Sequence, residues 1–112
     1  MKITIRFPPR KGSKRPAWEE TIIIPPFILK RALESDNPFD YLVSFIVDRI
    51  ADKYHQACIN RYRDLRFCAE KRIRYEHNIR PWIASVLSEV LRRIITDIKE
   101  GKVQKEYHMR LK

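Results

Sequence analysis

The feature that most constrains this 112-residue chain is the stretch 37–79, which has no glycine and has proline only at its second position. Asn37, followed by that proline and by an acid in the first turn, is typical of a helix start. It supplies an N-cap oxygen, a preset φ and a negative charge at the positive end of the helix dipole. Pro81 disfavours helical geometry in the residue before it. The stretch therefore predicts one long helix over residues 38–79, about 60 Å long at 1.5 Å per residue.

A helix of that length exceeds the width of a domain of this size, so it must bend, break, project or pair with a second copy. Its apolar stripe weakens past residue 60, where Arg61 and Arg72 fall inside the stripe. Three apolar side chains lie outside it: Ile59, Phe67 and Ile73. We therefore expect a kink or an exposed face in this part, and the pattern leaves open whether the helix breaks near 59–66.

Strand patterns lie at both ends of the chain. Residues 2–7 alternate between apolar and polar, and a second β-rich run begins at Trp18. The connection over 8–17 is rich in proline and basic residues, which predicts a β-hairpin with a long basic loop. A short helix is expected over 27–34.

The second half of the chain predicts a core helix and a closing strand. Apolar residues recur at helical spacing over 81–100, and Gly101 is the expected stop. Residues 103–111 alternate in the manner of a strand. We predict a single α+β domain over 1–112, in which the N-terminal hairpin and the C-terminal strand form a small antiparallel sheet. The short, long and core helices pack on that sheet.

Positive charge is the strongest compositional signal. Twenty-four Lys and Arg against 14 Asp and Glu give a net charge of +10, which is typical of a protein that binds a polyanion. Two clusters stand out, the first in the hairpin loop and the second among aromatic residues of the long helix. The first is Arg10, Lys11, Lys14 and Arg15, and the second is Arg61, Arg63, Arg66, Lys71, Arg72 and Arg74, interleaved with Tyr62, Phe67 and Tyr75. The residues predicted to contact phosphate are Arg10, Lys11, Lys14, Arg15, Arg63, Arg66, Lys71 and Arg74. The predicted function is non-enzymatic binding of nucleic acid through its phosphates, without strong sequence specificity. The residues do not distinguish DNA from RNA or single from double strands.

Two alternatives remain open. An adaptor or inhibitor would dock on another protein through the long helix, with Ile59, Phe67 and Ile73 as the interface, because exposed apolar residues mark contact surfaces. The length of the helix also favours a homodimer. A metal-dependent nuclease is the second alternative, although no catalytic residue, metal ligand set or cofactor is predicted.

The cysteines and histidines give weaker signals. Cys58 and Cys68 would be about 15 Å apart in a continuous helix, which is too far for a disulfide. Two free thiols indicate a reducing, cytoplasmic setting. Together with His55 and His77 they lack the paired spacing of a zinc site. No run of 18 apolar residues is present, so no membrane partner is expected.

Overall fold

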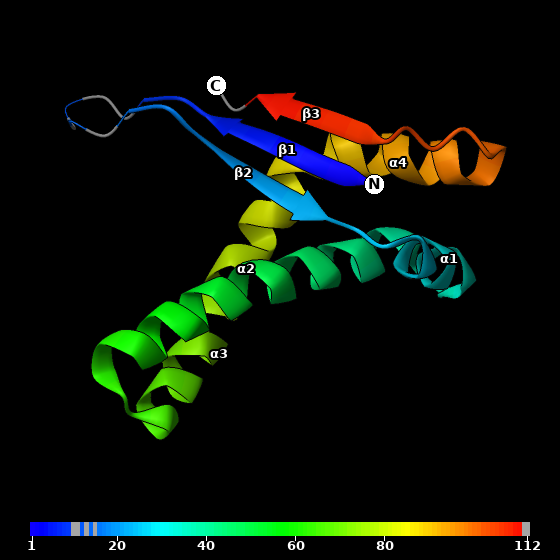
Figure 1. Cartoon of the computed structure of the whole chain (residues 1–112). Helices are drawn as coiled ribbons and strands as arrows, with labels where there is room; N and C mark the ends of the chain where they lie inside the picture. Colours follow the sequence, from blue (N-terminus) through cyan, green and yellow to red (C-terminus); the bar gives the residue numbers. More distant parts are fainter. Residues whose placement is uncertain (10–11, 13, 15, 111–112) are drawn as a thin grey trace.

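The structure is a computed structural model that describes residues 1–9, 12, 14 and 16–110. Its helices and strands confirm the predicted α+β class (Figure 1). In chain order they are β1 (Lys2–Phe7), β2 (Trp18–Ile23), α1 (Pro26–Glu34), α2 (Pro38–Tyr62), α3 (Leu65–Val86), α4 (Ser88–Glu100) and β3 (Glu106–Arg110).

The sheet is mixed rather than purely antiparallel. Its strand order is β2-β1-β3, and β1 pairs with β2 antiparallel, as the hairpin pattern predicted. β3, however, pairs with β1 in parallel, so the predicted antiparallel sheet was wrong in this pairing. A parallel neighbour needs a long crossover connection, and the helices between β2 and β3 provide one. The alternation over 103–111 fixed the faces of this strand but carried no information on its direction.

The hydrophobic core lies between one face of the sheet and the helices (Figure 1). Ile3 and Ile5 of β1 are buried in the same cluster as Leu42 of α2 and Leu91 of α4. The alternation of residues 2–7 therefore places the expected side chains inward. Gly101, at φ 69°, ends α4 in the left-handed conformation that favours glycine.

The long helix begins as predicted but does not continue to residue 79. The Asn37 side chain accepts a hydrogen bond from the Asp40 backbone N–H at 3.1 Å, which caps α2. α2 ends at Tyr62, and Arg63 adopts left-handed backbone angles, with φ 51° and ψ 29°. The Asp64 carboxylate then accepts from the Phe67 N–H at 3.1 Å and caps α3. Two antiparallel helices therefore replace the single helix over 38–79, and their junction falls where a kink was expected.

Arg72 holds the two helices of this hairpin together. Its guanidinium contacts Asp48 at 2.8 Å and Asp52 at 2.7 Å on α2, and Glu76 at 2.8 Å on its own helix. The hydrogen bond with Glu76 raises the pKa of Arg72 above its ordinary value, so the side chain stays charged. These contacts explain why an arginine lies on the apolar side of the sequence pattern.

Pro81 lies inside α3 rather than at a helix boundary. Proline removes one helical hydrogen bond and costs on the order of 3 kcal/mol in a helix interior. Burial of Ile83 and packing of Ile79 against the core, on either side of it, offset that cost. The predicted core helix over 81–100 is consequently divided between the end of α3 and α4, with the buried Leu87 at the junction.

The α2–α3 hairpin projects away from the sheet (Figure 1). The main core includes α2 only as far as Ile50 and α3 only from Ile79. The Cα radius of gyration is 15.5 Å, whereas a compact chain of this length has about 13 Å. The far end of the hairpin is thus held by contacts between its two helices and not by the core.

We predict that Arg72→Met lowers the free energy of unfolding by about 1–3 kcal/mol, because three carboxylates lose a shared cation. The matched control is Arg74→Met on the exposed face of the same helix, which should stay within about 0.5 kcal/mol of wild type. Urea denaturation measures both. Equal losses in the two variants would contradict the role assigned to Arg72.

Candidate nucleic-acid interface

The end of the hairpin, residues 59–74, is termed the hairpin tip. It carries an exposed aromatic pair, in which the rings of Tyr62 and Phe67 meet edge to face with centroids 5.3 Å apart. Tyr62 is 47% exposed and Phe67 38%. Leu65, beside them, is 69% exposed. Aromatic and apolar groups therefore reach solvent at the point of the molecule farthest along the hairpin.

Cations lie on these rings. The Lys71 ammonium is 5.3 Å from the centroid of Tyr62 and 5.0 Å from that of Phe67. The Arg61 guanidinium is 5.3 Å from the Tyr62 centroid. All three distances are within the range of a cation–π interaction. The rings thus hold two positive charges at the surface without neutralising them.

The tip brings together the four residues of the second cluster that were predicted to contact phosphate, Arg63, Arg66, Lys71 and Arg74, and also Arg61 of the same cluster. Within the described part of the chain, Arg66 is the only member of this set that has a carboxylate oxygen within 4.0 Å. That contact, to Glu70 at 3.9 Å, is weak because the Arg66 side chain is 93% exposed. Asp64, the acid at the turn, is used as a helix cap. The tip therefore has a surplus of unneutralised positive charge.

Arg63 is in an unfavourable backbone conformation. Among the described residues it is the one non-glycine residue with a positive φ. This conformation costs an L-residue roughly 1–2 kcal/mol, and glycine is the usual occupant at such a helix end. Arginine at this position departs from what stability alone favours, and departures of this kind cluster at functional sites.

The other predicted residues are placed less fully. Lys14 is exposed in the β1–β2 connection, whereas Arg10, Lys11 and Arg15 lie outside the described residues. The loop cluster thus remains a prediction. Of the predicted protein interface, Ile73 is 68% exposed and Phe67 belongs to the aromatic pair, but Ile59 is half-buried.

The sequence predicted Arg61 and Tyr62 as members of the second cluster but did not count Arg61 among the phosphate contacts. Arg61 was placed on the apolar stripe of a continuous helix, and the chain reversal two residues later exposes it instead. The signal that could have located the reversal was Asp64, because aspartate is a preferred N-cap residue.

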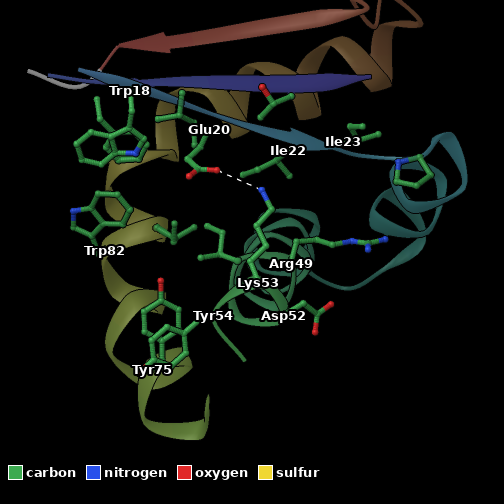
Figure 2. Close-up of a pocket in the computed structure, with 16 residues that line it drawn as sticks. Trp18, Glu20, Ile22, Ile23, Arg49, Asp52, Lys53, Tyr54, Tyr75 and Trp82 are labelled. Carbon is green, nitrogen blue, oxygen red and sulfur yellow. Dashed lines mark hydrogen bonds and ion pairs between the residues drawn. The ribbon is translucent and has the colours of Figure 1, made fainter. Parts of the chain in front are cut away.

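A second feature is a cavity of about 820 Å³ between β1, β2, α2 and α3 (Figure 2). Near β2 it is lined by Phe7 and Trp18, whose rings stack at 4.6 Å. Tyr54 and Tyr75 stack at 4.1 Å at its other end. Burial raises the pKa of Tyr75, which keeps its hydroxyl protonated. The cavity is thus a largely apolar space walled by aromatic rings, and its volume lies in the range of ligand sites.

Polar groups line the same cavity. The Lys53 ammonium lies 3.4 Å from the Glu20 carboxylate, so an ion pair joins α2 to β2 across the opening (Figure 2). Arg49 and Asp52 of α2 also line the space. Asp52 is paired with Arg72. Arg49 places a cation at the cavity wall, with its guanidinium 5.1 Å from the centre of the Phe45 ring.

β2 also forms one edge of the sheet. The Ile24 N–H donates to the Met1 carbonyl at 2.8 Å, so Ile24 and Met1 form a hydrogen-bonded pair just beyond the ends of the two strands. Hydrogen-bonded pairs alternate along antiparallel strands. The backbone groups of Glu20 and Ile22 therefore face β1, and those of Glu19, Thr21 and Ile23 face outward. An open row of donors and acceptors thus runs beside the cavity.

Comparisons with protein-family models, with curated proteins and with solved structures found no match for this chain. Within the described ranges, no group of three or more His, Cys, Asp or Glu side chains could hold a metal ion. None of the helices seen there is long and apolar enough to cross a membrane.

Arg63→Gly tests whether the turn is strained. We expect the free energy of unfolding to stay equal or to rise by up to about 1 kcal/mol, because glycine relieves the left-handed conformation. Thermal and urea denaturation check this, with Arg74→Gly as a control at an exposed position in the interior of α3 that should lose about 1 kcal/mol. A clear loss of stability in Arg63→Gly would show that the Arg63 side chain supports the fold.

Proposed function

We propose that this protein binds nucleic acid through phosphate contacts made by the hairpin tip, without strong sequence specificity. The observation that carries the proposal is the cluster of Arg61, Arg63, Lys71 and Arg74. None of these has an ion pair with a described carboxylate, and they surround the exposed rings of Tyr62 and Phe67.

The chemistry of the tip suits a sugar-phosphate backbone with accessible bases. Lys and Arg side chains contact phosphates and release condensed counterions, which supplies sequence-independent affinity. An exposed ring such as that of Tyr62 offers a base a stacking surface, and such stacking contributes about 1–3 kcal/mol per base. The tip lies away from the core, so its side chains can reach a ligand without steric conflict with the sheet. The tip therefore favours single strands, because their bases are free to stack.

Neutralising the tip should weaken binding and flatten its salt dependence. The variant Arg61→Gln, Arg66→Gln, Arg74→Gln should bind a single-stranded oligonucleotide on the order of tenfold more weakly at moderate salt. The slope of log Kd against log salt should fall by about one per lost phosphate contact. Fluorescence anisotropy over a salt series measures both quantities.

The matched control changes the net charge equally at the other end of the molecule. Lys30→Gln, Lys99→Gln, Lys102→Gln replaces exposed residues of α1, α4 and the segment after α4. It should leave the slope close to that of wild type. Equal losses in both triple variants would reduce the effect to net charge and would contradict an interface at the tip.

A second candidate function is docking of another protein, and it has its own observation. β2 presents outward backbone groups at Glu19, Thr21 and Ile23 beside the aromatic cavity. An extended peptide can add to such an edge as a strand, with alternate side chains entering a neighbouring pocket. We propose this form of the adaptor alternative, in place of docking along one continuous helix, because the helix is divided.

Thr21→Pro tests strand addition. It removes an outward N–H while leaving the β1-facing groups intact, and proline is tolerated at the solvent side of an edge strand. Peptides selected from a displayed library on the wild-type protein should lose binding to Thr21→Pro. They should keep binding to Thr21→Val, which retains the N–H. Unchanged binding to both variants, in protein that melts at the wild-type temperature, would exclude this edge.

A further inference from the structure

Two thiols face each other across the hairpin at the base of its tip. The sulfur atoms of Cys58 on α2 and Cys68 on α3 are 2.8 Å apart. Non-bonded carbon atoms pack at about 3.5–4.0 Å, and sulfur is larger than carbon. The side chains are buried, with 7% exposure for Cys58 and 0% for Cys68. No large movement of either helix is needed to join them.

The chain reversal creates this arrangement. Cys58 and Cys68 lie equally far before and after Arg63, where α2 ends and the direction of the chain turns. In a continuous helix the same residues would be about 15 Å apart. The expected separation therefore does not apply, because the structure divides that helix. Both cysteines are free thiols in the structure, as the sequence analysis predicted.

We propose that Cys58 and Cys68 form a reversible intramolecular disulfide that tethers α2 to α3 at the base of the hairpin tip. The bond closes a loop whose interior is residues 59–67. That loop contains Arg61 and Arg63 together with the Tyr62–Phe67 aromatic pair. The cross-link itself stands on the geometry of the thiols, and only its effect on nucleic-acid binding rests on the proposed function.

The oxidant we assign is a hydroperoxide, which is small enough to reach a nearly buried thiol. The Cys58 sulfur, the more exposed of the two, attacks the peroxide oxygen, so that the O–O bond breaks and a sulfenic acid and one water form from hydrogen peroxide. The Cys68 sulfur then attacks the Cys58 sulfur. The S–S bond forms, the S–O bond breaks, and the hydroxyl leaves as a second water with the Cys68 proton. Two thiols and one hydrogen peroxide thus give one disulfide and two waters.

Burial affects the rate of this reaction. It raises the pKa of Cys68 to about 11, and the neighbouring Cys58 thiol adds to the rise. The thiolate is the reactive form, so the resolving step is slow at neutral pH in the closed hairpin. Because the tip lies outside the core, local opening of its helices costs less than global unfolding. Such opening gives the peroxide access to the thiols, and the disulfide, once formed, restrains further opening of the two helices.

The direct test treats reduced wild-type protein with hydrogen peroxide and follows intact mass, peptide maps and melting. We expect a monomer that loses the mass of two hydrogen atoms and regains it with dithiothreitol. Trypsin should release residues 54–61 joined to residues 67–71. The melting temperature should rise by roughly 10 °C, as expected for a cross-link that closes a short loop in the unfolded chain. Cys58→Ala and Cys68→Ala should each abolish the shift in melting temperature.

Several results would overturn the disulfide. They are a covalent dimer, a sulfinic acid without the joined peptides, or an oxidised monomer that melts no higher than the reduced one. All three are read on wild-type protein, so they do not depend on whether the alanine variants fold.

Binding of a single-stranded oligonucleotide by the two redox forms separates this inference from the proposed function. A restrained tip loses less freedom on binding, so the oxidised form should bind about threefold to tenfold more tightly than the reduced form. A disulfide that forms while neither state binds supports the cross-link and contradicts the proposed function. Equal affinities in both states overturn the claim that the bond acts on the tip.

Discussion

The turn at Arg63 and Asp64 is the constraint on which the rest of this structure depends. A left-handed residue ends α2, and the next residue caps α3, so the chain reverses within two positions and without glycine or proline. This reversal sets Arg72 against the carboxylates of α2, stacks Tyr54 on Tyr75 and brings Cys58 to Cys68. Each contact joins a residue of α2, before the turn, to a residue of α3, after it. The stability of the hairpin and the chemistry of its tip therefore have one origin.

Sequence patterns predicted local features well, because these depend on neighbouring residues. The cap at Asn37, the hairpin of β1 and β2 and the stop at Gly101 all follow from side chains within a few positions. The helix break has only one weak local signal, the N-cap preference of Asp64, because arginine is rarely left-handed and neither Arg63 nor Asp64 interrupts a helix by itself. Contacts between residues far apart in sequence, such as Arg72 with Asp52, stabilise the divided helix. The same holds for Pro81, where burial of the surrounding α3 residues overrides the local preference.

The sheet shows the same limit in another form. Alternation over β3 indicates which side chains face the core, and Tyr107 is buried as that pattern requires. The Tyr107 hydroxyl donates to Asp97 at 2.6 Å, which ties β3 to the end of α4. The direction of β3 beside β1 is set by the path of the intervening helices, and no pattern within five residues can encode that path. Composition likewise predicted the basic cluster but not which of its members are paired with carboxylates.

Arg72 and Arg74 show why charge counts alone cannot locate a binding surface. They are two residues apart on α3, and each adds one positive charge to the composition. In the structure, Arg72 is held by three carboxylates, whereas Arg74 is exposed and has no ion pair with a described acid. A cation already paired offers little to a phosphate, because the ligand must first displace the carboxylates. An unpaired cation has no such competitor. The unpaired arginines and lysine of the hairpin tip, and not the net charge of the chain, therefore support the proposed binding of nucleic acid.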